Sequence, residues 1–249
     1  LKLYSPLQSW LLKRADKIVI TTPTYLKGSD TLKRYKDKIV CIPIGIDSKE
    51  LFIDQNTLNI LKNKYAGYKI VFSLGRIVYY KGFEYLIEAT RFLPANIIIL
   101  IAGVGELKEK LQEQILNLNL QNRVKLLGKI PFEELGAYYQ LCDIFCLPST
   151  DRSEAFGVVQ IEAMAFSKPI ISTSIHGSGV DWVNLNNISG IIVPPKNVNR
   201  LAEAITDLLT DKEKYNRLSE GAKKRYEDFF TKEKMVEEFK KLYLEILES

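Results

Sequence analysis

The sequence predicts an α/β protein with a doubly wound parallel sheet, and two observations point to that class. Short apolar runs rich in β-branched residues alternate with longer stretches whose apolar residues recur at helical spacing. Several short runs are apolar throughout, as residues 97–102 are, which is typical of strands covered by helices on both faces. Such repeated alternation indicates a Rossmann-like sheet, with the loops that follow its strands gathered along one edge.

The expected strands and helices follow from these two patterns, the short apolar runs and the helically spaced apolar residues. Phe83, Leu86 and Ile87, for example, fall on one face of a predicted helix. The expected strands cover residues 17–21, 39–43, 69–74, 97–102, 124–127, 144–147, 169–173 and 191–193. The expected helices cover residues 83–92, 107–118, 132–141, 155–165, 198–209, 212–230 and 231–248.

A boundary between two units is expected near residues 43–54. There a strand ends in turn residues, and a polar, loosely patterned stretch runs on to Asn63. Residues 1–45 would then belong with an upstream domain, and residues 50–225 would form a complete α/β domain. The chain starts Leu-Lys-Leu-Tyr, without Met and without a signal-peptide pattern, so we expect it to start inside a longer protein.

Composition and charge exclude several function classes. The chain has 249 residues, of which 46% are hydrophobic and 26% charged, and these are ordinary globular values. Its net charge of +5 is mild and scattered, so no nucleic-acid partner is expected. The longest apolar run, residues 97–102, is far shorter than the roughly 20 residues of a membrane helix. Three cysteines fit a reducing cytoplasm better than a disulfide scaffold, so a cytoplasmic location is expected.

The segment of residues 10–14, Trp-Leu-Leu-Lys-Arg, is amphipathic and basic. A helix packed on its own sheet explains that pattern, and a helix lying on a membrane surface explains it as well. Peripheral contact with the inner face of the cell membrane therefore stays open.

Two cations flank a turn that directly follows a predicted buried strand. Arg76 and Lys81 lie in this turn, where Gly75 and Gly82 allow the backbone to bend tightly and approach a ligand. In open α/β sheets, ligands bind at this carboxyl end of the strands. An arginine fork and a lysine point charge suit a diphosphate there. Two solvated surface cations would give the same pattern.

A second glycine-rich loop follows the strand predicted at residues 97–102. Gly103 and Gly105 resemble the start of a dinucleotide fingerprint, but Lys108 stands where the third glycine would be. That speaks against an NAD site. The two glycines are expected to allow a tight turn whose backbone lies near a nucleotide.

The most informative segment is residues 149–165, a polar loop followed by a helix expected from about Ala155. The start of that helix would offer free N–H groups and its positive dipole end to a phosphate. The N–H groups expected there belong to Phe156, Gly157 and Val158.

Two carboxylates in this segment, Glu154 and Glu162, stand eight positions apart. That spacing is about 12 Å along a helix. Glycosidase carboxylate pairs are about 5–9.5 Å apart, so these two are poorly placed to act as acid and base on one bond. They suit a long ligand such as a sugar nucleotide, because carboxylates accept hydrogen bonds from vicinal hydroxyls. A charge favoured at a helix N-terminus would also explain Glu154, and a solvent-facing helix residue would explain Glu162.

Together, the Gly-Arg-x4-Lys-Gly turn, the Gly-Val-Gly loop and Glu-x7-Glu resemble, in order and spacing, the GT-B glycosyltransferases of family 4 (group 1). Residues 149–169 resemble that family's signature. Residues 177–184 resemble a variant associated with bacterial surface-polysaccharide transferases, including mannosyltransferases. The resemblance covers nearly the whole chain.

The resemblance implies a domain organisation. Residues 1–45 would be the C-terminal remnant of an N-terminal acceptor domain, and residues 46–225 the nucleotide-sugar donor-binding domain. Residues 226–249 would be a helix packing back toward the N-terminal domain.

The resemblance also implies a reaction: the retaining transfer of a hexose from a GDP- or UDP-sugar, with a preference for GDP-mannose, to a glycan or lipid-linked acceptor in surface polysaccharide synthesis. Arg76 and Lys81 would neutralise the donor diphosphate, and Glu154 would contact the transferred sugar. Glu162 would bind the ribose hydroxyls. The other donor contacts that it implies are Gly75, Gly103, Gly105, Lys129, Ile130, Phe156, Gly157 and Val158.

No metal and no cofactor is expected. The sequence contains no Asp-x-Asp pair, which is the manganese clamp of GT-A transferases. Cys142 and Cys146 are best explained as buried thiols. His176, the only histidine, is expected in a loop near the site rather than as a general base.

Two other functions stay open. One is a nucleotide-sugar epimerase, which can share the GT-B architecture, and the other is a non-catalytic nucleotide-binding module. Because the loops of the acceptor domain would lie upstream of Leu1, we expect residues 1–249 alone to bind UDP or GDP but to transfer little or no sugar.

Overall fold

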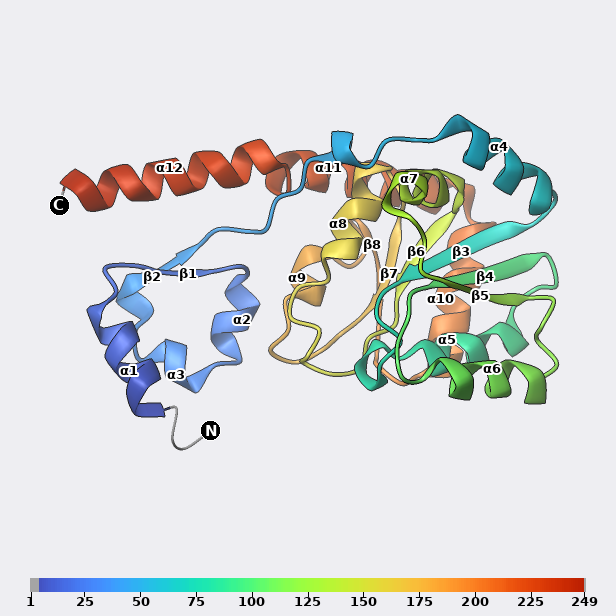
Figure 1. Cartoon of the computed structure of the whole chain (residues 1–249), viewed down its shortest axis with the longest axis horizontal. Coiled ribbons are helices and arrows are strands. Elements are labelled where there is room, and N and C mark those ends of the chain that lie inside the picture. The colour runs from blue at the N-terminus through green and yellow to red at the C-terminus, as the bar shows by residue number, and fades with distance from the viewer. Residues whose placement is uncertain (1–4, 249) are drawn as a thin grey trace.

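The computed structural model describes residues 5–248 and shows two units (Figure 1). The smaller unit holds a two-stranded parallel sheet, β1 (Ile18–Ile20) and β2 (Ile39–Cys41), with the helices α1 (Ser5–Arg14), α2 (Pro23–Lys27) and α3 (Asp30–Lys33). The larger unit holds a six-stranded parallel sheet. Residues 1–4, on which the expectation of an upstream part rests, and residue 249 lie outside the described residues.

The order of the six strands fixes where a ligand would bind. The order is β5-β4-β3-β6-β7-β8, so the chain adds two strands on one side of β3 and then three on the other. In doubly wound sheets, the crevice at this reversal, outside the carboxyl ends of the strands, is the ligand site. The strands are β3 (Lys69–Leu74), β4 (Ile97–Ala102), β5 (Val124–Gly128), β6 (Ile144–Leu147), β7 (Ile170–Thr173) and β8 (Gly190–Val193).

Helices cover both faces of this sheet (Figure 1). Successive strand residues therefore enter opposite cores: Phe72 packs in one and Val71 in the other, and both are fully buried. This two-sided burial explains why the strands are apolar throughout, and the predicted α/β class is confirmed. The first core is covered by α4 (Gln55–Lys64), α7 (Phe132–Leu141), α8 (Val158–Ala165) and part of α11 (Lys212–Phe229), and the second by α5 (Phe83–Ala89), α6 (Lys108–Asn117) and α10 (Val198–Thr210).

The polar, loosely patterned sequence up to Asn63 predicted no helix, yet residues 55–64 form α4. Asp54 caps this helix, its Oδ2 accepting a hydrogen bond from the Thr57 N–H at 3.0 Å. Leu58 and Leu61 are buried against the first core. These two leucines fall on one face, whereas Ile60 is exposed, so packing of two residues rather than propensity decides the structure.

The helix expected from Ala155 begins instead at Val158. Gly157 adopts a left-handed conformation, with φ of 76°, and so cannot extend the helix toward the N-terminus. Glu154 consequently lies in the loop before α8, and the helical distance of about 12 Å between Glu154 and Glu162 does not apply.

The last helix, α12 (Lys232–Glu248), runs back along the smaller unit (Figure 1). Lys17 Nζ lies 2.6 Å from Glu245 Oε1. At the other end of α12, the Ile46 N–H donates to the Phe230 carbonyl and the Lys232 N–H donates to the Ile46 carbonyl, both at 2.9 Å. These two backbone hydrogen bonds connect the start of α12 to the segment that follows β2. The assignment of residues 1–45 to an acceptor domain stays a prediction.

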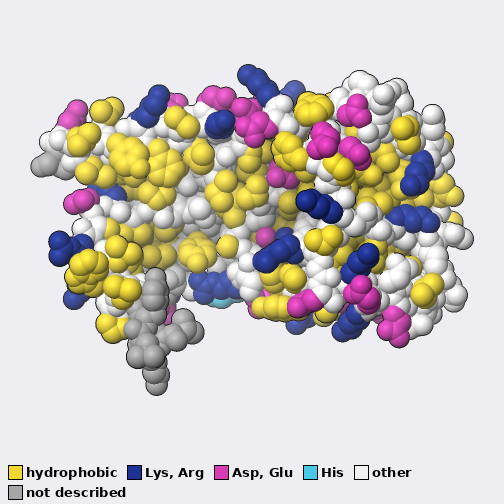
Figure 2. Space-filling view, viewed as in Figure 1, with side chains coloured by type: hydrophobic (Ala, Val, Ile, Leu, Met, Phe, Trp, Pro, Cys, Tyr) yellow, Lys and Arg dark blue, Asp and Glu magenta, His cyan; other side chains and the backbone are white. Residues whose placement is uncertain are grey.

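Helix α1 leaves part of its apolar face exposed. Trp10 and Leu11 are more than half exposed, and the Arg14 guanidinium lies over the Trp10 ring at 5.1 Å. Figure 2 shows further hydrophobic side chains over this end of the molecule. Among residues 5–248, no helix combines the length and apolar character that a membrane span requires. Contact of residues 10–14 with a membrane surface stays a prediction.

Candidate functional site

The turn after β3 and the loop after β6 meet at the reversal of the sheet. The two strands are neighbours, so the segments that follow them start side by side. The Thr150 N–H donates to the Tyr80 carbonyl at 2.8 Å. Gly82, with φ of 66°, lies so close to the second loop that a Cβ there would be 2.2 Å from the Pro148 carbonyl oxygen. Glycine is required at this position both for its backbone conformation and for the contact.

Lys81 and Glu154 form a buried ion pair across these two loops. Lys81 Nζ lies 2.7 Å from Glu154 Oε2, and each side chain is 9% exposed. Ser149 Oγ donates to the same carboxylate oxygen at 2.8 Å. Within the described residues nothing donates to the other oxygen, Oε1, so it is free to accept a hydrogen bond from a ligand hydroxyl.

Arg76 stands beside this pair and is exposed. Its Nη2 donates to the Tyr80 hydroxyl at 3.0 Å. The Tyr80 hydroxyl and, to a smaller degree, the Glu154 carboxylate raise the pKa of the Arg76 guanidinium. The structure therefore brings Arg76, Lys81 and Glu154 together. Gly75, which was also expected near the ligand, lies directly against the Lys81 side chain. A Cβ at this position would be 2.8 Å from Lys81 Cε.

The loop that carries Glu154 is held by buried hydroxyl groups that the sequence did not single out. Thr173 Oγ1 donates to the Ser149 carbonyl, and Ser178 Oγ donates to the Glu154 carbonyl. The Gly179 N–H donates to the Ala155 carbonyl at 2.8 Å. Thr173 and Ser178 are buried, so the hydrogen bonds of their side chains fix the orientation of the Glu154 loop against β7 and the segment that follows it.

Gly103 and Gly105 have a local structural reason to be glycine. A Cβ on Gly103, whose φ is 139°, would lie 1.8 Å from the Gly75 carbonyl oxygen, and one on Gly105 would lie 2.2 Å from the Ile77 carbonyl oxygen. The Ile77 N–H donates to the Val104 carbonyl at 2.8 Å. These glycines let the loops after β3 and β4 touch. The expected proximity of their backbone to a nucleotide stays a prediction.

The three expected N–H donors straddle the start of α8. Phe156 and Gly157 precede the helix, and Val158 is its first residue. The Phe156 side chain is buried, its ring edge-to-face with Phe230 at 6.1 Å, so only its backbone could face a ligand. The first N–H groups of α8 have no partner within the helix and are suitable donors to an anion.

Glu162 lies on α8, one turn into the helix. Its Oε2 accepts a hydrogen bond of 2.5 Å from the Tyr139 hydroxyl. Burial raises the pKa of this carboxyl, and the Tyr139 hydrogen bond opposes that rise. Glu162 and Phe132 line a cavity of about 290 Å³, whose other walls are the segment after β2 and the start of α12.

The two residues expected to contact the nucleotide base, Lys129 and Ile130, directly follow β5. Lys129 is exposed, and Ile130 is half-buried and packs against the first core. Phe132, two residues further on, is exposed and lines the same cavity as Glu162. The expected contact of Lys129 and Ile130 with the base stays a prediction.

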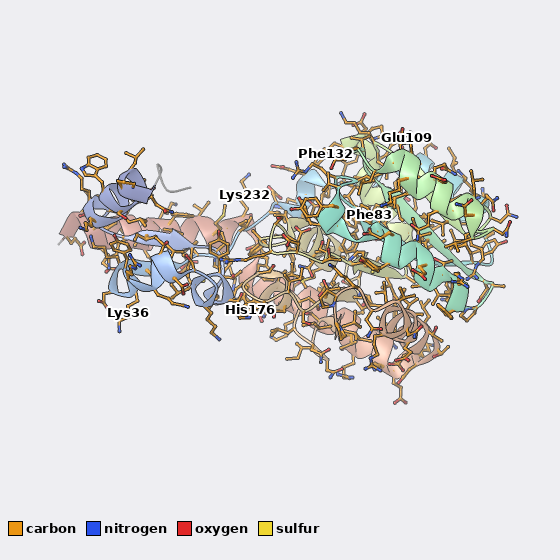
Figure 3. The ribbon with its side chains drawn as sticks, turned by 90° about the horizontal axis from the view of Figure 1, so that it is seen from below. Lys36, Phe83, Glu109, Phe132, His176 and Lys232 are labelled. Carbon is orange, nitrogen blue, oxygen red and sulfur yellow. The ribbon has the colours of Figure 1, made fainter. Side chains whose placement is uncertain are left out.

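The smaller unit closes the other side of the site. Arg152 Nε donates to the Gly177 carbonyl at 3.1 Å, and its guanidinium lies 5.5 Å from the Tyr25 ring of α2. A Cβ on Gly28 would lie 2.6 Å from the Gly177 Cα, so α2 and the loops after β6 and β7 are in contact. His176 is exposed in the loop after β7, and Figure 3 shows it where the two units meet.

The cysteines are free thiols rather than ligands. Cys142 and Cys146 are fully buried, and burial raises the pKa of the Cys142 thiol to about 12. Across residues 5–248, no three His, Cys, Asp or Glu side chains gather in a way that could hold a metal ion. That the reaction needs no metal stays a prediction.

A family model described as glycosyl transferases group 1 matches residues 55–225, which span the six-stranded sheet and both site loops. The chain belongs to this family. The resemblance seen in the motifs is therefore confirmed.

Curated relatives agree with this membership. The chain is 33% identical over 249 residues to the O-antigen chain mannosyltransferase C of Escherichia coli, covering 100% of this chain and 66% of that protein. It is 33% identical over 232 residues to a D-rhamnosyltransferase of Pseudomonas aeruginosa, covering 93% of this chain and 60% of that protein. The chain thus spans 60–66% of the length of these two curated relatives.

Solved structures confirm the GT-B type of fold. Sucrose-phosphate synthase of Thermosynechococcus elongatus superposes with a TM-score of 0.84 at 26% identity, covering 99% of this chain and 62% of that one. A glycosyltransferase of Rickettsia africae superposes with a TM-score of 0.84 at 25% identity, covering 98% and 67%.

Proposed function

We propose that the protein transfers a hexose, with retention of configuration, from a nucleotide-diphosphate sugar to a glycan or lipid-linked acceptor in surface polysaccharide synthesis. One observation carries the proposal: the buried Lys81–Glu154 pair stands beside the exposed Arg76 at the crevice where the sheet reverses its winding. Cations and a carboxylate with one free oxygen suit a ligand that joins a diphosphate to a sugar.

The donor would extend across the carboxyl ends of the strands. Arg76, Lys81 and the first N–H groups of α8 would face the diphosphate, and Glu154 Oε1 would accept from hydroxyls of the hexose. The ribose would lie at Glu162 and the base beside Ile130. Diphosphate leaves readily once its charge is matched, so the task of these residues is to position the donor and stabilise the developing charge.

We propose GDP-mannose as the donor. The relative named O-antigen chain mannosyltransferase C is 33% identical along the whole chain, and this similarity supports mannose as the transferred sugar. Residues 1–45 would supply the last part of an acceptor-binding domain, which fits the contact of α2 with the loop that carries Glu154.

A binding and transfer experiment tests the proposal. The melting temperature is measured with GDP, UDP, ADP and their sugars, because a ligand that binds only the folded state at 100 times its Kd stabilises it by about 2.7 kcal/mol. We expect GDP-mannose and GDP to raise the melting temperature most. Transfer is then assayed with radiolabelled GDP-mannose and membrane-derived lipid-linked glycan on residues 1–249 joined to the acceptor domain of a full-length family member, because residues 1–249 alone are expected to transfer little or no sugar. No shift with any nucleotide would contradict the proposal, and conversion of the donor to another sugar nucleotide without acceptor would favour an epimerase.

Arg76→Ala tests the diphosphate contact. We expect GDP to bind about 10- to 100-fold more weakly to this variant, since a hydrogen bond to a charged group is worth about 1.5–3 kcal/mol. Guanosine, which has no phosphate, should bind unchanged. Calorimetry measures both affinities, with Arg200→Ala as the control because Arg200 lies on α10 and forms an ion pair with the exposed Glu203. Equal losses for GDP and guanosine would exclude a role of Arg76 at the diphosphate.

A further inference from the structure

The hydrogen bond between Tyr139 and Glu162 joins two helices that are distant in sequence. Tyr139 lies on α7 and Glu162 on α8, and the hydroxyl oxygen is 2.5 Å from Glu162 Oε2. A hydrogen bond this short to a carboxylate is of the charge-assisted kind, and it favours the ionised acceptor. Its geometry depends on how firmly each partner is held.

The Tyr139 ring is locked in an aromatic cage. Its ring centroid lies 5.6 Å from that of Phe166 in a stacked arrangement, 5.5 Å from that of Phe72 edge-to-face and 5.7 Å from that of Phe145. The residue is fully buried. Because the ring cannot turn away, the hydroxyl hydrogen has one charged acceptor within reach.

The carboxylate has one oxygen committed and one available. Oε2 accepts from Tyr139, whereas no donor among residues 5–248 reaches Oε1. Glu162 also lines the cavity of about 290 Å³, on the wall that it shares with Phe132. The tyrosine therefore fixes which carboxylate oxygen is free to meet a ligand in the cavity.

The other charged residues around this cavity are one lysine and two carboxylates that share it. Lys232 Nζ, from the start of α12, lies 3.8 Å from Asp47 Oδ2 and 3.6 Å from Glu50 Oε1, and all three residues line the cavity (Figure 3 labels Lys232). Of the charged and titratable residues that face Glu162 from α7, the segment after β2 and α12, Tyr139 alone hydrogen-bonds it within the described part of the chain.

We propose that Tyr139 is a positioning residue for nucleotide recognition: it keeps Glu162 ionised and aims one oxygen of its carboxylate at the vicinal hydroxyls of the donor ribose. The inference rests on the proposed function for the identity of the ligand. It concerns a residue that touches Glu162 and not the donor. A purely structural role of Tyr139 predicts loss of stability only, without a pH-dependent or ribose-dependent effect on binding.

Tyr139→Phe removes the hydroxyl and keeps the ring. Calorimetry is run from pH 5.5 to pH 8 with GDP, UDP and their 2′,3′-dideoxy analogues. We expect the variant to bind the ribonucleotide about tenfold more weakly near neutral pH, since the Glu162 carboxylate is no longer held where it can bond the ribose, and a hydrogen bond to a charged group is worth about 1.5–3 kcal/mol. The loss should grow as the pH falls, because Glu162 without its donor protonates at higher pH than in the wild type. The dideoxy analogue should bind both proteins alike.

Tyr65→Phe is the matched control. Tyr65 is also buried in the first core, but its hydroxyl has no hydrogen-bond partner in the described part of the protein. This variant should bind both nucleotides as the wild type does at every pH. A pH-independent loss for Tyr139→Phe that is equal for ribose and dideoxyribose ligands would overturn the proposal.

Two spectroscopic measurements separate this inference from the proposed function. Carbon-13 NMR of the Glu162 carboxyl, without nucleotide, should give a higher pKa in Tyr139→Phe than in the wild type, and equal values would overturn the inference even if GDP binds. Should Tyr139→Phe fail to fold, the wild type should show a low-field hydroxyl proton that disappears in Glu162→Gln, and its absence from the wild type would be equally decisive. Failure of the wild type to bind any nucleotide would instead overturn the proposed function.

Discussion

Glu154→Ala is expected to lower the free energy of unfolding by about 3–5 kcal/mol, because it leaves the ammonium group of Lys81 buried without its partner. Lys81 Nζ lies 2.7 Å from Glu154 Oε2, and both side chains are 9% exposed. Ser149 Oγ donates a hydrogen bond to the same carboxylate oxygen. The variant should also bind GDP-mannose no more tightly than GDP, since Oε1 is the acceptor proposed for the hexose hydroxyls. Urea denaturation measures the first effect and calorimetry the second.

A double variant and a surface control make this result decisive. Lys81→Ala combined with Glu154→Ala should unfold less readily than Glu154→Ala alone, because no unpaired charge then stays buried. Glu203→Ala breaks a comparable contact of 2.6 Å, with Arg200, but both of those side chains are about 60% exposed. Its cost should be below about 1 kcal/mol. Equal costs for Glu154→Ala and Glu203→Ala would show that the buried pair contributes no more than a surface pair.

The strands were predictable because a strand that is buried on both faces is apolar at nearly every position. Residues 97–102 are apolar without exception, and the structure has β4 at those residues. Helix α4 was not predicted, because Leu58 and Leu61 are its only two buried residues, and its other positions are polar except for the exposed Ile60. Its structure depends on α7 and the Asp54 cap, and contact with another helix is a tertiary property that a local pattern does not carry.

The site was predictable as a set of residues but not as a set of contacts. Arg76, Lys81 and Glu154 were named from their positions after strands, yet the pairing of Lys81 with Glu154 joins residues 73 positions apart. Tyr139 gave no signal, since a tyrosine among apolar helix residues is ordinarily core. Its orientation toward Glu162 follows from the packing of α7 beside α8, which only the folded chain determines.

The glycines illustrate the same limit and lead to a further prediction. Gly103 was expected to be glycine so that its backbone could approach a nucleotide, but a Cβ there would lie 1.8 Å from the Gly75 carbonyl oxygen of the neighbouring loop. Close contact of two backbones would require glycine with or without a ligand. The free energy of unfolding of a Gly103 variant without nucleotide therefore measures the cost of placing a Cβ against the Gly75 carbonyl.

Gly103→Ala is expected to lower the free energy of unfolding by more than about 3 kcal/mol, since a side chain at φ of 139° is strained and its Cβ would also push the Gly75 loop away. Gly67→Ala is the matched control, with φ of 83° and nothing within 4 Å of its Cβ, so it should cost only about 1–2 kcal/mol of backbone strain. Urea denaturation without nucleotide measures both. Because the displaced loop carries Arg76, Gly103→Ala should in addition weaken GDP binding, whereas Gly67→Ala should leave it unchanged. Similar stability losses for the two variants would mean that the loop yields easily, and that the contact between the loops after β3 and β4 does not hold Arg76 in place.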